Sequence, residues 1–213
     1  MIFNVIKASS GGFPSVNEQV KNGLRAWYVQ QLHSLIRDHP DDYYLTLTAA
    51  EIMRHFGFHD DALKYSLKCL KVREDDDEFQ SKVYGTVASV YAETQELSEA
   101  LECHEKALKL KLKWLLERHP EVAAIYNNIA LIYDDQGQHD KALKLFEKSS
   151  SSRLETLGEN HADVGASYNN LANLYMSTGE PVKAIEYHTK SLELNLKICG
   201  ENHPDTASCS QLL

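Results

Sequence analysis

The chain has 213 residues and a formal net charge of -9, with 43% hydrophobic and 25% charged residues. These values are typical of a folded globular protein. The acidic balance argues against DNA or RNA as partners, because polyanions need clustered Lys and Arg. No stretch approaches the roughly 20 apolar residues that span a bilayer, and the apolar start 1–6 is too short for a signal peptide. We therefore expect a cytoplasmic protein with neither a nucleic-acid nor a membrane partner.

Residues 1–38 lie outside any clear periodicity and are predicted to form an N-terminal extension with a capping helix. The run Ser15-Val16-Asn17-Glu18 has the form of a capping box, which marks a helix start. The helix after it is expected to cover the open end of the region that follows. Its predicted contact face consists of Val20, Leu24, Trp27, Leu32, Leu35 and Ile36.

Sequence segments then recur at a spacing of 42 residues. Five columns hold over three periods: Tyr84, Tyr126 and Tyr168; Ala88, Ala130 and Ala172; Tyr91, Tyr133 and Tyr175; Gln95, Gly137 and Gly179; and Ala100, Ala142 and Ala184. Such self-similarity is the signature of a repeat architecture. The recurring histidines His39, His119, His161 and His203 mark unit boundaries. They divide a domain over 39–213 into units 39–76, 77–118, 119–160 and 161–202, with a partial fifth unit at 203–213.

Each unit is predicted to form two antiparallel helices. In the third unit, Tyr126 and Tyr133 belong to an apolar pattern of helical spacing, Gly137 suits a helix end, and Phe146 belongs to a second helical pattern. The small side chains Ala130 and Ala142 would let the two helices approach closely. Since one hairpin cannot bury its apolar face alone, neighbouring units are expected to stack.

Prolines indicate where several of these helices begin. Pro40, Pro120 and Pro204 are predicted in the first turn of a first helix, and Pro181 in the first turn of a second helix. Proline is tolerated there because its missing N–H has no partner within the helix.

The two ends of the array depart from the pattern. The first unit has Thr46 and Met53 in the tyrosine columns, although Ala50, Gly57 and Ala62 hold. The run 203–213 stops inside an expected first helix, so we expect the chain to be a fragment of a longer array. The alternative is that 203–213 forms a short cap helix.

This pattern resembles the tetratricopeptide-repeat (TPR) family, specifically its 42-residue subclass found in kinesin light chains. The runs 168–175 (YNNLANLY), 157–161 (LGENH) and 199–204 (CGENHP) carry the resemblance, which covers about four fifths of the chain. It implies an all-α fold, a right-handed superhelical solenoid of antiparallel helix pairs.

The resemblance also implies a ligand-binding groove along the first helices, which line the concave face in this family. The groove positions of three units hold Lys82, Ser89 and Glu93, then Asn127, Asn128, Leu131, Asp134 and Asp135, then Asn169, Asn170, Asn173 and Met176. Asn side chains carry a donor and an acceptor that suit an extended peptide backbone. Alternatively, these Asn residues fit between stacked helices or cap locally.

No pattern of catalytic or metal-binding residues emerges. The four cysteines contain no CxxC pair of the kind that zinc sites use, and they are predicted to be small buried hydrophobes. The adjacent Cys103 and His104 point about 100° apart on a helix, which does not suit a nucleophile and its base. The recurrent histidines are interpreted as structural corner residues. We therefore expect no cofactor, no metal and no enzymatic activity.

The sequence favours an adaptor or scaffold that holds a partner peptide in the groove. Family clamps for acidic chain ends use Lys or Arg, whereas here Lys82 is the one cation and Glu93, Asp134 and Asp135 are acidic. The ligand is therefore expected to be extended and neutral or basic. The alternative is a sensor or regulatory arm of a larger protein whose catalytic or signalling domain lies outside this chain. The oligomeric state and the partner's identity stay open.

Overall fold

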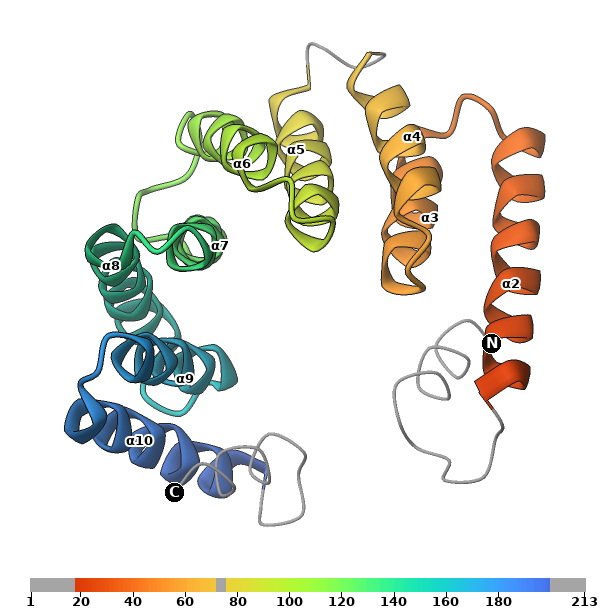
Figure 1. The fold of residues 1–213 in the computed structure, drawn as a ribbon. Helices are drawn as coiled ribbons and strands as arrows, with labels where there is room; N and C mark the ends of the chain where they lie inside the picture. Colours follow the sequence, from red (N-terminus) through yellow and green to blue (C-terminus); the bar gives the residue numbers. More distant parts are fainter. Residues whose placement is uncertain (1–17, 72–75, 200–213) are drawn as a thin grey trace. The chain divides into compact units, whose positions relative to one another are not determined.

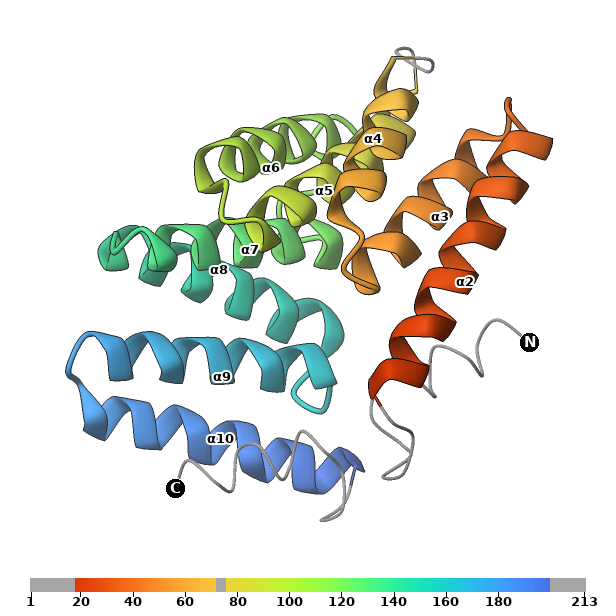
Figure 2. The ribbon, with the colours of Figure 1, turned by 45° about the vertical axis from the view of Figure 1, so that its right-hand side comes forward.

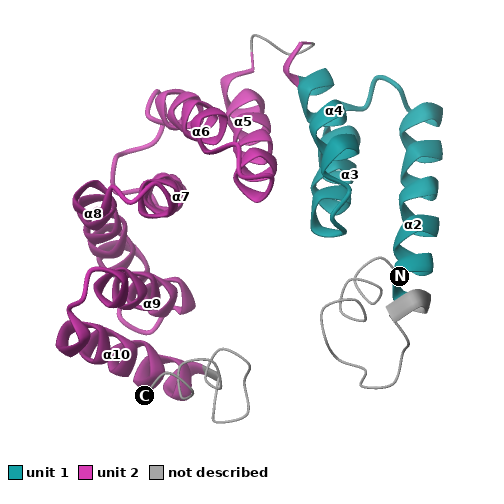
Figure 3. Cartoon of the chain, in the orientation of Figure 1, with its two compact units in different colours: residues 1–69 teal, residues 70–213 magenta. Residues whose placement is uncertain are grey.

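A computed structural model describes residues 18–71 and 76–199 of the chain. These residues form helices joined by short turns, and no strand occurs among them. None of the helices in these two ranges is long and apolar enough to cross a membrane. The chain divides into two compact units, residues 1–69 and residues 70–213, which are coloured separately in Figure 3.

Unit 1 contains helices α2 (Glu18–Asp38), α3 (Tyr43–His55) and α4 (His59–Leu70). The rings of Tyr28 on α2 and Phe56 after α3 meet edge to face with their centroids 5.8 Å apart. The hydroxyl of Tyr65 on α4 lies 2.8 Å from Nδ1 of His33 on α2. Both the α3–α4 hairpin and the α2 helix therefore contribute to one small body.

A helix, α2, is present where the sequence predicts an N-terminal one, its role as a cap of the array stays a prediction, and its predicted contact face is partly wrong. Val29, Leu32 and Ile36 are buried, whereas Leu24, Trp27 and Leu35 are exposed. The sequence places apolar residues on two faces of α2, and periodicity does not say which face meets α3. Residues Ser15, Val16 and Asn17 of the proposed capping box lie outside the described residues.

Unit 2 contains three consecutive helix hairpins, visible in Figures 1 and 2. Their helices are α5 (Asp77–Glu93) with α6 (Leu97–Lys111), α7 (Pro120–Asp135) with α8 (His139–Leu157), and α9 (Ala162–Ser177) with α10 (Pro181–Cys199). Between hairpins, α6 packs against α7 and α8 packs against α9. The predicted two helices per unit and the stacking of neighbouring units are confirmed here.

The core of unit 2 follows the alternation of small and large residues. Ala130 and Ala142 are fully buried in one cluster with Phe146, Leu171 and Leu174. That cluster draws on α7, α8 and α9, so a single hairpin does not complete it. Burial of apolar side chains across the junction between units is what stabilises a repeat array.

The turn inside each hairpin contains a residue of the column Gln95, Gly137 and Gly179, to which Gly57 corresponds in the first unit. Gly57, Gly137 and Gly179 have φ between 72° and 84°, and Gln95 in the same column has φ 66°. This left-handed conformation ends a helix and suits glycine, which has no Cβ to clash.

Pro120 and Pro181 are the first residues of α7 and α10, as predicted. The prediction for Pro40 is wrong, because α3 begins three residues later at Tyr43. Asp42 caps that helix instead, its carboxylate accepting from the backbone N–H of Leu45 at 2.9 Å. Pro204 lies outside the described residues.

The corner histidines have a defined structural role. His119 and His161 are the N-caps of α7 and α9, and Nδ1 of each accepts from a backbone N–H two residues on, at 3.2 and 3.1 Å. A cap of this kind satisfies one of the free N–H groups at a helix start. The interpretation as corner residues is confirmed for these two, and His203 lies outside the described residues.

Candidate functional site

The first helices of unit 2, α5, α7 and α9, carry all the predicted groove residues. Those with exposed side chains are Lys82, Glu93, Leu131, Asp135, Asn173 and Met176. Ser89, Asn128, Asp134, Asn169 and Asn170 are half-buried, and Asn127 is 8% exposed. The predicted stripe is therefore a mixture of accessible residues and residues within the packing between helices.

Two of the predicted asparagines contact each other across the repeat junction. Nδ2 of Asn170 on α9 donates to Oδ1 of Asn127 on α7, at 2.8 Å. A buried amide must find such a partner, because an unpaired one costs free energy. For Asn127 this contact favours the alternative in which the side chain fits between stacked helices. Asn169 and Asn173 extend the polar face beyond this pair.

The charged side chains on this face differ in whether they already have a partner within the protein. Asp134 lies 2.9 Å from Nδ1 of His139, and Lys82 lies 2.6 Å from Glu78 on its own helix. Both pairs are partly exposed, so each is weak. Asp135 is exposed and has no hydrogen bond or ion pair within the described ranges. Asp135 is thus accessible to a ligand, and Glu93 is exposed as well.

Two apolar side chains stand out on the same face. Leu131 on α7 is 41% exposed and Met176 on α9 is 57% exposed. Single exposed apolar residues are common, but here they flank amides and carboxylates on neighbouring first helices. Met is flexible enough to adapt to differing ligand side chains.

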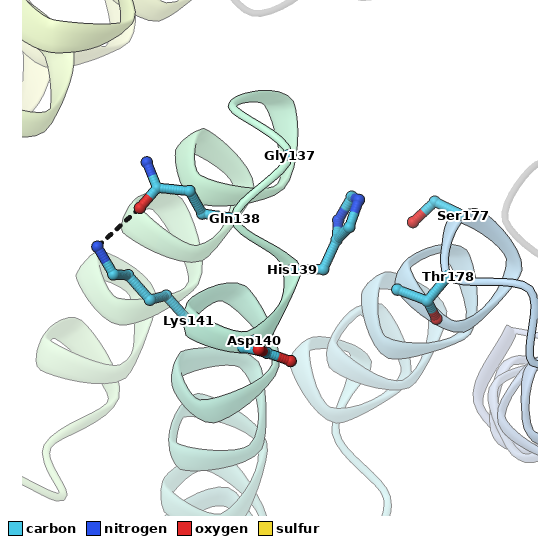
Figure 4. Close-up of a pocket in the computed structure, with 7 residues that line it drawn as sticks. All are labelled: Gly137, Gln138, His139, Asp140, Lys141, Ser177 and Thr178. Atoms are coloured by element: carbon cyan, nitrogen blue, oxygen red, sulfur yellow. Dashed lines mark hydrogen bonds between the residues drawn. The ribbon is translucent and has the colours of Figure 1, made fainter.

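A hollow of about 640 Å³ lies where the α7–α8 turn faces the end of α9 (Figure 4). It is lined by Gly137, Gln138, His139, Asp140, Lys141, Ser177 and Thr178. Lys141 donates to the Gln138 side chain at 2.7 Å, the contact drawn as a dashed line. Because His139 also contacts Asp134, this hollow adjoins the acidic end of the predicted stripe.

The histidines and cysteines of the described residues serve packing. His104 on α6 and His188 on α10 are buried with Nδ1 unbonded, in the column that Phe146 fills on α8. Burial lowers the pKa of His104 to about 4 and lowers that of His188. Cys69 and Cys103 are buried free thiols, and burial raises the pKa of Cys69 to about 11 and also raises that of Cys103.

These residues confirm the core interpretation of Cys69, Cys103 and His104. A thiol that stays protonated is a poor nucleophile. Within residues 18–71 and 76–199, no group of three or more His, Cys, Asp or Glu side chains could hold a metal ion. The side chains of Cys199 and Cys209 lie outside the described residues.

One column of polar residues at the repeat junctions was missed by the sequence reasoning. Arg153 on α8 is buried and donates to the Asp163 carbonyl at 3.2 Å and to the Ser167 hydroxyl at 2.8 Å, both on α9. Lys111, one period earlier on α6, is buried and pairs with Glu121 on α7. The sequence did contain a signal for this column, because Lys111 and Arg153 are both cations and lie one period of 42 residues apart.

Comparison with known families agrees with this architecture. A tetratricopeptide-repeat model matches residues 43–113, 79–155, 121–194 and 163–213. No curated protein sequence matches the chain significantly.

Several solved structures share the fold. BtubC (BKLC) from P. vanneervenii has 20% identity and a TM-score of 0.69, with 93% of this chain and 85% of that one covered. A putative kinesin light chain with nearly identical TPR-like repeats from Podosopora anserina has 22% identity and a TM-score of 0.69, with coverage of 82% and 84%. MamA 41-end from Desulfovibrio magneticus RS-1 has 16% identity and a TM-score of 0.61, with coverage of 92% and 95%.

At these identities the structures establish the fold alone. Repeats of this type typically form non-catalytic modules that bind other proteins, so the chain is a protein-interaction scaffold in general terms. The four matched stretches, the hairpins of unit 2 and the 42-residue period together show that this chain belongs to the tetratricopeptide-repeat family.

Proposed function

We propose that the chain is an adaptor that binds an extended segment of a partner protein along the first helices α5, α7 and α9. The observation that carries this proposal is the accessible polar and apolar face formed by Leu131, Asn173 and Met176, next to which Asn169 is half-buried. An extended backbone can bond to amides whatever its sequence, while apolar side chains give contact area. The Asn127–Asn170 bond supports this by fixing the spacing of α7 and α9.

The ligand we propose is neutral or basic. Glu93 and Asp135 are exposed along the same face, whereas the cation Lys82 is already paired with Glu78. Opposite charge steers association and excludes like-charged partners. Asp134 contributes less, because His139 lies against it.

The test replaces both carboxylates at the end of the stripe, Asp134→Asn with Asp135→Asn. A basic peptide selected from a peptide array should bind several-fold more weakly to this variant, and an acidic peptide should bind equally well or better. A matched control removes two exposed carboxylates from α6, Glu99→Gln with Glu105→Gln, and should leave both affinities unchanged. Equal losses in the two variants would show that only net charge matters and that the face has no specific role.

A second variant tests the face without changing its charge. Asn173→Ala removes an exposed amide, and Asn169→Ala removes a half-buried one. Pull-down of a bound partner should fall with either, while Asn127→Ala should lower stability because it leaves Asn170 without its buried acceptor. Retention of the partner by a folded Asn169→Ala, Asn173→Ala double variant would contradict binding on this face.

A further inference from the structure

Helix α10 is the last described helix of unit 2, and it packs against α9 (Figure 2). A stripe of uncharged side chains runs along it at alternating steps of three and four residues: Val182, Ile185, Thr189, Leu192 and Leu196. Val182 is 80% exposed, Ile185 is 54% exposed and Leu196 is 39% exposed. Such steps are those of the a and d positions in a heptad, with which helices pair side by side. A row of exposed apolar side chains marks a surface that another molecule or segment normally covers.

One part of this stripe corresponds to the side of a second helix that faces the next hairpin. Ile185 shares a repeat column with Leu101 and Leu143, which are both half-buried. Leu101 packs against a cluster that includes Ile129 of α7, and Leu143 packs against a cluster that includes Leu171 of α9. Ile185 is therefore exposed at a position where a following helix covers its counterparts.

Two other positions of the stripe are uncharged and non-acidic only on α10. Their counterparts on α6 and α8 are polar: Ser98 and Asp140 in the column of Val182, and Glu105 and Glu147 in the column of Thr189. All four counterparts are exposed, although α6 packs against α7 and α8 packs against α9. A following first helix thus leaves these two columns in solvent and gives no reason for Val182 or Thr189. A partner that covers the whole heptad stripe does give one.

We propose that the stripe of α10 pairs with the same stripe of a second copy of the chain, with the two helices antiparallel. When the helices cross near Thr189, Val182 lies opposite Leu196 of the second copy, and Ile185 lies opposite Leu192 of the second copy. Each large apolar side chain of the stripe then has an apolar counterpart. A two-fold arrangement of this kind is closed, so association ends at a dimer.

The charged residues beside the stripe fit the same arrangement. They alternate in sign along one flank of the helix: Lys183, Glu186, Lys190, Glu193 and Lys197. In the antiparallel pair, Lys183 lies beside Glu193 of the second copy, and Glu186 lies beside Lys190 of the second copy. Within one copy Lys190 pairs with Glu186, and Lys183 pairs with Glu180, each at 2.6 Å. Because exposed ion pairs contribute little, they can rearrange when the second copy binds.

The net charge of α10 also favours this helix as the contact between copies. The chain carries a formal net charge of -9, so two copies repel each other on average. Helix α10 has three Lys and two Glu residues, a balance of one positive charge with His neutral. An interface built on α10 therefore keeps most of the acidic surface of each copy away from the other.

The first test gives α10 the residues of α8 in two columns of the stripe. Val182→Asp with Thr189→Glu makes this change, which the folded α7–α8 hairpin already tolerates. Sedimentation of the wild-type full chain between about 1 and 100 μM should show a concentration-dependent dimer, as expected for a small interface. The variant should dimerise at least about tenfold more weakly, because pairing would bury unpaired carboxylates. The matched control Ser98→Asp with Ser151→Glu adds the same charge at exposed positions of α6 and α8 and should leave the dimer unchanged.

The second test examines the pairing of the charges between copies. Lys183→Glu with Lys190→Glu makes the flank acidic, and Glu186→Lys with Glu193→Lys makes it basic. Each variant alone should be monomeric, because like charges then face each other across the two-fold axis. An equimolar mixture of the two should form a heterodimer, which a cover from within the same chain could not produce.

Three results would overturn the proposal. A wild-type chain that stays monomeric at about 100 μM would show that no second copy covers the stripe. A dimer that persists unchanged in Val182→Asp, Thr189→Glu would place the interface elsewhere. Two monomeric charge variants that do not associate when mixed would contradict the antiparallel pairing. Far-UV circular dichroism checks that each variant keeps the helix content of the wild type, and if a charge variant unfolds, the first test decides alone.

Discussion

Four residues at the turns between paired helices adopt a left-handed backbone, and one of them is not glycine. Gln95 has φ 66°, while Gly57, Gly137 and Gly179 occupy the corresponding turns. For residues with a Cβ this conformation costs roughly 1–2 kcal/mol, offset in part by the lower chain entropy of a non-glycine residue when unfolded. The α5–α6 turn is thus a strained version of the others.

Gln95→Gly should raise the free energy of unfolding by about 1 kcal/mol, because it removes that strain. The reciprocal change Gly137→Gln should lower it by a similar amount. A Cβ at Gly137 would meet no atom within 4 Å, so the loss would report conformation and not steric overlap. Urea denaturation of both variants measures the two effects, and a stabilised Gly137→Gln would contradict the explanation.

The alanine columns limit the size of side chains where helices pack. Ala130 is fully buried in the cluster with Phe146 and Leu171. Ala130→Leu should therefore destabilise the protein by about 1–3 kcal/mol through overpacking. Ala166→Leu, an exposed alanine on the first helix α9, is the control and should change stability by less than about 0.5 kcal/mol. Equal melting temperatures for Ala130→Leu and wild type would be inconsistent with the packing described here.

Three of the second helices, α4, α8 and α10, make the same kind of side-chain hydrogen bond to the first helix of their own hairpin. Cys69, Ser149 and Ser191 donate to backbone carbonyls of α3, α7 and α9, at 3.6, 2.7 and 2.9 Å. These three residues occupy one column of the repeat. A side chain bonded to a carbonyl of the preceding helix restricts both the position and the rotation of the two helices, so this column helps to align three of the four hairpins, and the α5–α6 hairpin has Ala107 there.

Buried histidines on α6 and α10 make these helices sensitive to acid. The pKa of His104 is about 4 in the folded chain, below its ordinary value of 6.5, because burial disfavours the charged ring. The unfolded chain therefore binds the proton more readily, and stability present above pH 6.5 is lost as the pH falls toward 4. His188 shifts in the same direction for the same reason.

His104→Phe copies the residue of α8, where Phe146 is buried in the same column. The wild type should lose about 2 kcal/mol more than this variant between pH 7.5 and pH 5. Denaturant midpoints across that range measure the difference. The double variant His104→Phe, His188→Phe should flatten the profile further, and parallel profiles for wild type and His104→Phe would contradict the assignment of the acid sensitivity to His104.

At the scale of the whole molecule, charge decides more about partners than about the fold. The chain carries a formal net charge of -9, and the exposed carboxylates of the proposed binding face share that sign. Such a field raises the association rate of basic ligands and disfavours acidic ones. Association driven this way depends on ionic strength, because exposed charges are screened within about 10 Å at 0.1 M salt.

Raising the salt concentration from about 0.05 M to about 0.5 M should weaken a basic peptide ligand by about 1 kcal/mol, or roughly fivefold. The affinity of a neutral peptide of equal length should change little, since its contacts are amide bonds and apolar area. Isothermal titration at both concentrations compares the two. A stronger salt effect on the neutral peptide than on the basic one would argue against the acidic face as the source of selectivity.

The sequence by itself determined the repeat, the helix pairs and much of the core. A period of 42 residues fixes which residues are equivalent, and helical spacing assigns Ala130, Phe146 and His104 to the interior. The equivalent positions Gly57, Gly137 and Gly179 also located the turns, because a glycine at the same place in several units implies the same backbone conformation in each. These features depend on the spacing of residues within one helix pair. Because every unit repeats that spacing, a single sequence shows the same pattern several times.

Only the tertiary structure decided which face of α2 is buried, where α3 begins and what the asparagines contact. Leu24 and Leu32 are equally apolar, but one is exposed and the other buried because α3 meets a single side of the helix. Asn127 and Asn170 stand 43 residues apart, and their bond depends on the rise and rotation between hairpins. Pro40 precedes its helix because Asp42 supplies a better cap. Each outcome depends on distances between helices, and these distances cannot be read from the spacing of residues along the chain.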